Sequence, residues 1–409
     1  MLNRKRQVFA AVVAVTFSFL FVVHHPLASA ADGGDFGFYQ SSGETHPYPL
    51  IKGLKARNVI LCIGDGMGLG QVALARLSVA GPDGKLYMER MPVAGLMWTH
   101  AADNLVTDSA ASATAMACGF KTNNGMVGML PDEGSCETIL EAARARQMAT
   151  GLVATSGITH ATPACFAAHV PSRNMQAKIA EQMLAARVNV IFGGGREYFL
   201  PKSSSDSIRN DERNLIAGAQ DAGYSYIRTA DQLRSVEADF VLGLFAAGAL
   251  TTREPEPSLA ELTEKAIEIL SGQKKKVLGF FNEPKGFFLM VEGSQIDWAC
   301  HDNDVNECVR QTLLFDEAVK AAIEFAIADR RTLIVVTADH ETGGLTVSDG
   351  SLSGAELKIH FSSRGHTATP VPVYAFGPGA EQFSGVYDNT SIAKKIALLL
   401  GIKDFAYTK

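Results

Sequence analysis

The chain has 409 residues, of which 47% are hydrophobic and 20% are charged, and its formal net charge is −6 at pH 7. This length and apolar content predict a folded protein with a large core and argue against disorder. The acidic balance, without any Lys/Arg-rich block, argues against nucleic acid as a specific partner.

The first 30 residues have the pattern of a secretory signal peptide. Residues 4–6 are basic, an apolar run extends from Val8 to Val23, and residues 28–30 supply the small side chains of a cleavage site. Cleavage after Ala30 removes three positive charges and no acids, so the charge becomes −6 − 3 = −9. The alternative is a retained anchor, but the run is shorter than the roughly 20 residues that span a bilayer. We therefore predict a periplasmic or secreted protein without stable membrane insertion after cleavage.

Six cysteines follow the predicted signal and would meet an oxidising compartment. They are Cys62, Cys118, Cys136, Cys165, Cys300 and Cys308. None forms a CxxC motif, which argues against a cysteine-ligated zinc site. Cys300 and Cys308 cannot pair within one continuous helix, because eight residues rise about 12 Å. A break at residues 302–304 would make the pairing possible.

After a polar arm at residues 31–57, the apolar residues 58–63 predict a buried strand. The strand ends in a glycine-rich turn at residues 64–70. A dinucleotide fingerprint is excluded because Leu69 or Gln71 falls where the last glycine of GxGxxG should be. Asp65 at the centre of the turn would repel a pyrophosphate but would suit a cation. The alternative for Asp65 is a simple turn residue that caps the next helix.

Residues 106–115 place Asp108 and Ser109 at the head of an alanine-rich predicted helix. The start of a helix presents unsatisfied N–H groups and a positive dipole, so an anion such as phosphate binds there readily. Taken alone, the same pattern also fits an ordinary helix cap. Evidence from other residues is needed to distinguish an anion-binding site from an ordinary helix cap.

The middle of the chain alternates helices and strands. Helices are predicted at residues 137–147 and 175–187, strands at 151–155 and 188–192, and a surface loop at 203–214. This rhythm predicts an α/β fold with a doubly wound, mostly parallel central sheet and helices on both faces. No convincing domain boundary divides residues 31–409, so we predict a single domain with small insertions at about 200–285.

Three predicted strands end in acidic residues. Asp65 follows the first, Glu292 ends the strand at 287–292, and Asp339 and His340 follow the strand at 332–337. Because ligands of open α/β sheets bind outside the carboxyl ends of the strands, these groups should converge at one edge. Asp297 and His301 are four residues apart, which places them on one face of a helical turn. Such oxygen and nitrogen ligands suit Zn²⁺.

The motifs that carry these residues resemble those of bacterial alkaline phosphatases, in family order and over essentially the whole mature chain. They are Ile63–Gly68, Thr107–Ala115, Glu292–Asp297, Thr337–Glu341 and Gly365–Thr367. The resemblance implies a homodimer with two zinc sites and one magnesium site in each chain. It assigns Asp297, His301 and His366 to the first zinc, Asp339, His340 and Asp65 to the second, and Glu292, Thr162 and Asp65 to magnesium.

The resemblance also implies hydrolysis of phosphate monoesters through a phosphoserine on Ser109. Arg173 matches the arginine that grips phosphate, and its two parallel N–H bonds suit a dianionic monoester. Asp108 is predicted to orient Arg173. Two zinc ions would act as Lewis acids on the attacking and leaving oxygens.

Two positions vary within the family. Some members have Asp at the position of His160 and Lys at the position of Trp298, whereas this chain has the histidine and tryptophan of other members. His160 is expected to ligate the third metal directly or through water, and it favours zinc over magnesium there. Trp298 lacks the charged amine with which a lysine reaches phosphate.

Two alternatives stay open at this stage. A phosphodiesterase or sulfatase of the same superfamily is one, although sulfatases have a Cys/Ser-x-Pro-x-Arg motif that is missing around Ser109, and diesterases usually place Thr there. The other is a non-catalytic metal- or phosphate-binding protein of the periplasm. Such a protein would need the ligands but no nucleophile between them, so Ser109 argues against it.

Overall fold

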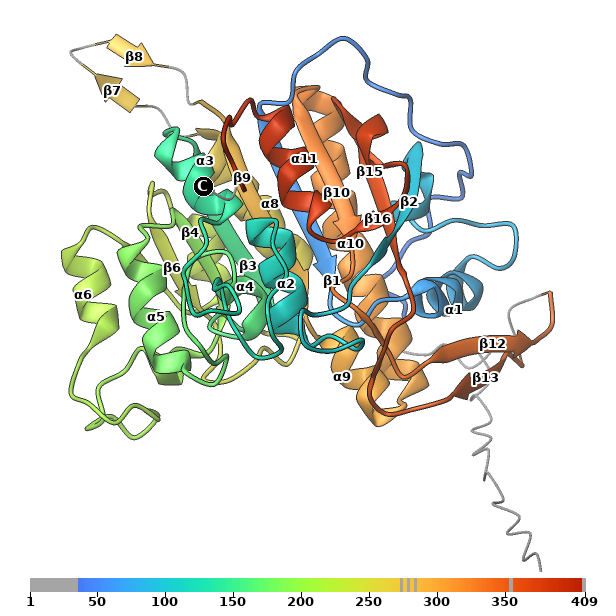
Figure 1. Ribbon diagram of the computed structural model, residues 1–409, viewed down its shortest axis with the longest axis horizontal. Coiled ribbons are helices and arrows are strands. Elements are labelled where there is room, and N and C mark those ends of the chain that lie inside the picture. The colour runs from blue at the N-terminus through green and yellow to red at the C-terminus, as the bar shows by residue number, and fades with distance from the viewer. Residues whose placement is uncertain (1–35, 273–274, 278–279, 283–284, 353–355, 407–409) are drawn as a thin grey trace, which may run out of the picture.

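The computed structural model describes residues 36–272, 275–277, 280–282, 285–352 and 356–406 (Figure 1). The predicted signal peptide and its cleavage site lie outside these residues. A ten-stranded sheet runs through the molecule, and helices cover both of its faces. The predicted fold class is thereby confirmed.

The sheet has the strand order β16-β2-β15-β10-β1-β9-β3-β4-β6-β5. All neighbouring strands are parallel except β15, which is antiparallel to both β10 and β2. The strands are β1 (Asn58–Gly64), β2 (Val93–Trp98), β3 (Ala149–Gly157), β4 (Val190–Gly194), β5 (Ser225–Ile227), β6 (Val241–Leu244), β9 (Phe287–Gly293), β10 (Thr332–Thr337), β15 (Val371–Phe376) and β16 (Gly385–Asp388).

The central strands β1, β9 and β10 are buried along their whole length. Their sequences are nearly continuous runs of branched and aromatic residues, as expected for parallel strands that are covered on both faces. Within the residues that the structure describes, three two-stranded sheets accompany the main one. They pair β7 (Lys275–Val277) with β8 (Phe280–Asn282), β11 (Glu341–Thr342) with β14 (His366–Thr367), and β12 (Leu345–Asp349) with β13 (Lys358–Phe361).

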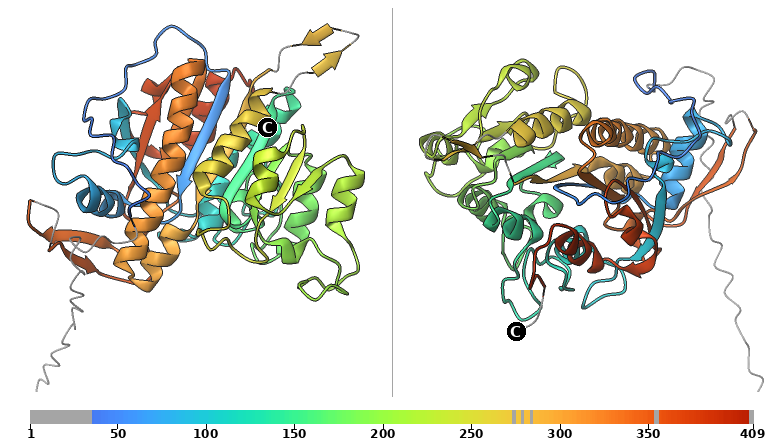
Figure 2. Two further views of the ribbon diagram at one scale, coloured as in Figure 1. Left: turned by 180° about the vertical axis from the view of Figure 1, so that it is seen from behind. Right: turned by 90° about the horizontal axis from the view of Figure 1, so that it is seen from above.

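Two long helices, α8 (Leu259–Gly272) and α10 (Val305–Asp329), lie across one face of the sheet (Figure 2). Helix α1 (Leu69–Val79) packs beside α10. The other face carries α2 (Ser109–Cys118), α3 (Ile139–Ala145), α4 (Ala161–Ala164) and α11 (Ser391–Leu399). The other α-helices of the described residues are α5 (Gln176–Ala185), α6 (Leu215–Asp221), α7 (Ala230–Ser235) and α9 (Gln295–Asp302).

Helix α2 is buried at every residue, which its small side chains permit. Asp108 caps the helix, because its Oδ1 accepts a hydrogen bond of 2.9 Å from the Ala111 N–H. The helix ends at Gly119, whose φ of 78° lies in the left-handed region. Ser109 is therefore the first residue of a rigid, enclosed helix.

A sharp break separates α9 from α10. Asn303 adopts a left-handed conformation with φ of 56°, and the Asp304 side chain caps α10 by accepting a hydrogen bond of 3.0 Å from the Glu307 N–H. The break falls at the residues where the sequence left that possibility open. It turns the chain so that Cys300 and Cys308 come close together, with 3.5 Å between their Sγ atoms.

None of the helices within the described residues combines the length and apolar character that crossing a membrane requires.

Candidate active site

The pairing of the central strands sets the acidic residues at one edge of the sheet. Ile63 of β1 is in register with Thr337 of β10 on one side and with Glu292 of β9 on the other. Asp65 and Asp339 each follow their strand by one or two residues, so they emerge beside Glu292. The predicted convergence at the carboxyl ends of the strands is present.

Asp65, Asp339 and His340 form what we call the inner group. One ligand atom from each lies within 4.8 Å of the others, and all three side chains are fully buried. Asp339 Oδ1 accepts hydrogen bonds from the N–H groups of Gly66 (3.1 Å) and His340 (2.9 Å). Asp339 Oδ2 and both carboxylate oxygens of Asp65 have no hydrogen-bond partner among the described residues.

The pKa shifts in the inner group indicate that its carboxylates lack a compensating positive charge. Burial, followed by the charge of Asp339, raises the pKa of Asp65 well above its usual range. Burial lowers the pKa of His340, which keeps its imidazole neutral. Buried carboxylate oxygens without hydrogen bonds are costly unless a charge compensates them. A bound cation would remove this cost, so these residues fit a metal ion.

Asp297, His301 and His366 form the outer group, whose ligand atoms also lie within 4.8 Å of one another. The Nδ1 atoms of both histidines bond to backbone carbonyls: that of His301 to Arg364, and that of His366 to Thr107 at 2.8 Å. Each carbonyl fixes a proton on Nδ1. The two Nε2 atoms then turn toward each other at 3.2 Å and toward Asp297 Oδ1, at 3.3 and 3.5 Å.

Unlike the inner group, the outer group partly neutralises itself. A hydrogen bond to Asp297 raises the pKa of His301 to about 9. Burial acts to raise the pKa of Asp297, but hydrogen bonds from His301 and His366 outweigh it and hold that pKa well below its usual range. In the neutral state, two unprotonated Nε2 atoms and a carboxylate would point at one place, which suits Zn²⁺.

A third group shares Asp65 and adds His160 and Glu292. Glu292 Oε2 accepts a hydrogen bond of 2.7 Å from Ser294, whereas Glu292 Oε1, Thr162 Oγ1 and His160 Nδ1 are buried without a hydrogen bond from the described residues. Burial raises the pKa of Glu292 to about 7 and lowers that of His160 to about 4. A neutral His160 is able to ligate a metal.

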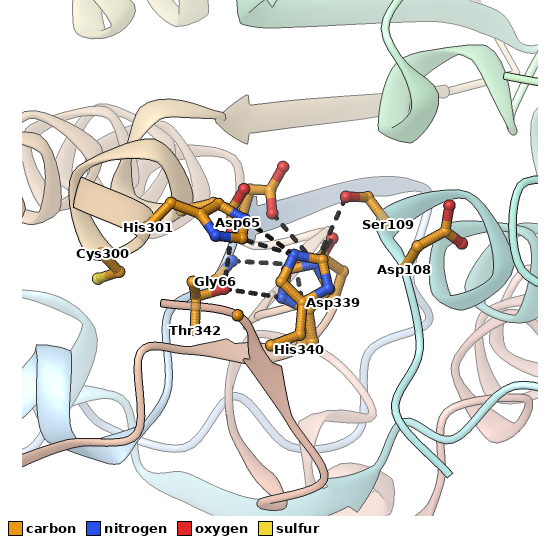
Figure 3. Close-up of polar contacts among 12 residues, drawn as sticks. Asp65, Gly66, Asp108, Ser109, Cys300, His301, Asp339, His340 and Thr342 are labelled. Carbon is orange, nitrogen blue, oxygen red and sulfur yellow. Dashed lines mark hydrogen bonds and ion pairs between the residues drawn. The ribbon is translucent and has the colours of Figure 1, made fainter. Parts of the chain in front are cut away.

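Ser109 and Asp108, at the start of α2, lie beside the inner group (Figure 3). Ser109 Oγ is 3.4 Å from His340 Nε2. Arg173 forms an ion pair with Asp108, at 2.9 Å between Nη1 and Oδ2, so the predicted contact is present. Its Nη2 lies 3.3 Å from His160 Nε2. Trp298 packs edge-on against His160, with 6.0 Å between the ring centres.

Sequence reasoning missed Thr342, which connects the inner and outer groups. Its hydroxyl donates to Asp297 Oδ1 at 2.5 Å and lies 3.2 Å from His340 Nδ1 (Figure 3). If the hydroxyl accepts from Nδ1, the Nε2 of His340 stays free to face Asp65 and Asp339. The only available signal was its place two residues after His340.

Gly66 was also missed as part of this site. Its φ is +75°, and an added Cβ would lie 2.7 Å from the Cα of Asp297. Glycine therefore allows α9 to approach the turn after β1. The glycine-rich turn serves this close approach and the N–H bond to Asp339.

Comparisons with known proteins agree with this geometry. The family model described as "Alkaline phosphatase" matches residues 56–359 and 354–402. Alkaline phosphatase 4 of Bacillus subtilis is 36% identical, over 84% of this chain and 88% of its own length, and alkaline phosphatase of Escherichia coli is 34% identical, over 85% and 87%. The structure of alkaline phosphatase from the Antarctic bacterium TAB5 superimposes with a TM-score of 0.75 at 35% identity, covering 86% of this chain and all of that one. A variant of the TAB5 enzyme with histidine replaced by aspartate is described with Mg bound in its M3 site.

Proposed function

We propose that this chain, which belongs to the alkaline phosphatase family and is a phosphoric monoester hydrolase, works through a phosphoserine formed on Ser109. The position of Ser109 carries the proposal. Its hydroxyl lies at the start of α2 and 3.4 Å from an inner-group ligand atom. The family assignment favours a hydrolase over the non-catalytic binding protein.

In this mechanism Ser109 Oγ attacks phosphorus while the ester P–O bond breaks and the alcohol leaves. Water then attacks the phosphoserine and releases inorganic phosphate. Arg173 holds two non-bridging oxygens, and Asp108 fixes its guanidinium plane through the ion pair. The positive end of the α2 dipole favours the charge that gathers on the phosphoryl group.

We propose that the inner and outer groups each hold Zn²⁺. Bound there, the ions supply Lewis acidity to the attacking and leaving oxygens. The third group would hold Mg²⁺ or Zn²⁺ through Asp65, Glu292, Thr162 and His160. Because imidazole suits zinc better than magnesium, His160 should shift this site toward zinc.

The experiment that tests the mechanism is acid trapping of the intermediate. Mixing the enzyme with radiolabelled aryl phosphate and quenching at low pH should leave label on the tryptic peptide that contains Ser109. Ser109→Ala should carry no label and lose about 10³-fold or more in kcat. Unchanged turnover in that variant would contradict the proposal, and a higher rate on the matching diester would favour the phosphodiesterase.

The third site is tested by metal content. His160→Asp should raise the magnesium to zinc ratio in protein that is loaded from equal concentrations of both ions. An unchanged ratio would mean that His160 does not determine which metal binds.

We also propose that residues 31–409 form a single domain, that the protein is exported to the periplasm or medium, and that it forms a homodimer. Signal cleavage can be read by amino-terminal sequencing, and the oligomeric state by light scattering.

A further inference from the structure

Cys300 and Cys308 lie on opposite sides of the break between α9 and α10. Cys300 is in the last turn of α9, directly before His301, and Cys308 is in the first turn of α10. Both are fully buried, and their Sγ atoms are 3.5 Å apart. Figure 3 shows the Cys300 sulfur directed away from the metal-ligand groups.

Backbone hydrogen bonds in the turn between α9 and α10 keep the two sulfur atoms close to each other. The N–H of Asn303 donates to the Cys300 carbonyl at 3.1 Å, and that of Asp304 donates to the Ala299 carbonyl at 2.8 Å. A disulfide has an S–S length of about 2.05 Å, so the sulfurs need to approach by only ~1.5 Å. The bond therefore requires only a small further approach of two side chains that are already in contact.

We propose that Cys300 and Cys308 form a disulfide bond that locks the end of α9, and with it His301, to the start of α10. The inference rests on the proposed export, because disulfides persist in oxidising compartments. Helix α9 is only eight residues long and carries both Asp297 and His301. A cross-link one residue before His301 would therefore restrain the outer group directly.

The bond forms by exchange with a disulfide of a folding catalyst or small molecule. One cysteine thiolate attacks that disulfide to give a mixed disulfide, and the second thiolate then displaces the other sulfur. The two cysteines lose two protons and two electrons, and the oxidant is reduced to two thiols. Because both side chains are buried in the native fold, the exchange takes place during folding.

Burial also limits the reactivity of the two thiols if they have not paired. Contact with Cys300, followed by burial, raises the pKa of the Cys308 thiol well above its usual range. A thiol in this environment reacts slowly once the protein has folded. Cys118 and Cys136 are also neighbours, since the Cys118 Sγ lies 3.5 Å from the Cys136 carbonyl oxygen.

Peptide mapping tests the bond. The full-length protein is exported and unfolded in denaturant at slightly acidic pH while a maleimide alkylates its free thiols, and it is then digested without reduction. A peptide pair joined through Cys300 and Cys308 is expected. Alkylation of both as free thiols, or linkage of either to another cysteine, would overturn the proposal. Amino-terminal sequencing of the same sample shows whether the signal was removed, so failed export is distinguished from a failed disulfide.

The restraint is tested on enzyme that is unfolded, refolded with metal in the presence or absence of a phosphine reductant, and checked by peptide mapping for the state of Cys300 and Cys308. Reduction should lower the urea midpoint of the wild type and speed the loss of zinc to a chelator. Cys308→Ala should behave like the reduced wild type under both conditions, whereas the control Cys165→Ala should keep the response to reduction. A wild type that is insensitive to the reductant would overturn the restraint even if Cys308→Ala failed to fold.

Discussion

The inner and outer groups use similar ligands but differ in how far they depend on a cation. Asp65, Asp339 and His340 are fully buried, and three of their carboxylate oxygens have no hydrogen bond from the described residues. In the outer group, by contrast, the side chain of His301 is 38% exposed and the histidines neutralise Asp297. The inner group therefore places acidic side chains together in a buried position without a compensating positive charge. In the outer group, the two histidines supply most of that charge.

This difference teaches that a site can be pre-organised in two ways. Strand ends and backbone N–H groups hold the inner carboxylates rigidly, at the cost of stability when no cation is bound. Carbonyl groups that select the histidine tautomers arrange the outer group. Variants that remove one ligand from each group should therefore have unequal effects.

The largest effect is expected from Asp65→Asn, because Asp65 belongs to two of the three ligand groups. We expect the loss of two metal ions per chain and a fall in kcat/KM beyond the roughly 10- to 100-fold that outer-shell partners cost. The matched change Asp297→Asn should remove one ion. Metal analysis of the dialysed proteins checks both, and equal losses in the two variants would contradict the ranking.

Metal removal should make stability depend on pH. In the metal-free protein, Glu292 has its pKa raised from 4.5 to about 7, so its contribution to stability is lost as the pH rises through about 7. The pair of His301 and Asp297 contributes fully between pH 3.8 and pH 6.5, the ordinary pKa values of the two groups, and that contribution is lost as the pH rises through about 9. Both changes have the same sign.

The midpoint of thermal unfolding, measured from pH 5 to pH 9, checks this expectation. The gap between metal-loaded and metal-free protein should widen as the pH rises, because bound cations favour the ionised carboxylates and neutral imidazoles. A gap that stays constant would show that neither group titrates in this range.

A smaller effect is expected at the phosphate grip. In Asp108→Ala, Arg173 loses its ion pair and α2 loses its cap, while the residues of both metal-ligand groups are unchanged. The pair is about three-quarters buried, so we expect a fall in kcat/KM of about 10-fold, chiefly through KM. Arg173→Ala should cost more. Initial rates on one aryl phosphate give kcat and KM for both variants. If the metal content of Asp108→Ala fell by the same factor as its kcat/KM, Asp108 would instead belong to the metal-ligand groups.

Much of this arrangement was predictable from the sequence. Continuous branched runs identified β1, β9 and β10, and the acidic residues at their ends identified the edge where the site lies. The contact of Asp108 with Arg173 was also predicted. These features depend on local pattern or on the shared direction of parallel strands.

Other features depend on contacts that local sequence does not encode. Strand β15 is antiparallel to its neighbours β10 and β2, and this direction depends on the path of the chain between β10 and β15. The sequence alone does not establish the helix break at Asn303, because the left-handed conformation is only one of several that an asparagine adopts. The proton positions on His301 and His366 are set by carbonyls that lie 63 and 259 residues away.

Thr342 offers the mildest and sharpest test, because it contacts both groups. In Thr342→Val the shape is kept, but Asp297 loses a hydrogen bond and His340 Nδ1 loses its partner. We expect about a 10-fold loss of metal affinity, shared between the inner and outer groups. Thr346→Val, in an exposed part of β12, is the matched control. Chelator titration followed by metal analysis separates the two sites, and weakening at one alone would show that the hydroxyl serves only that group. Shared weakening would mean that the self-neutralised outer group and the cation-dependent inner group are tuned together by a single side chain.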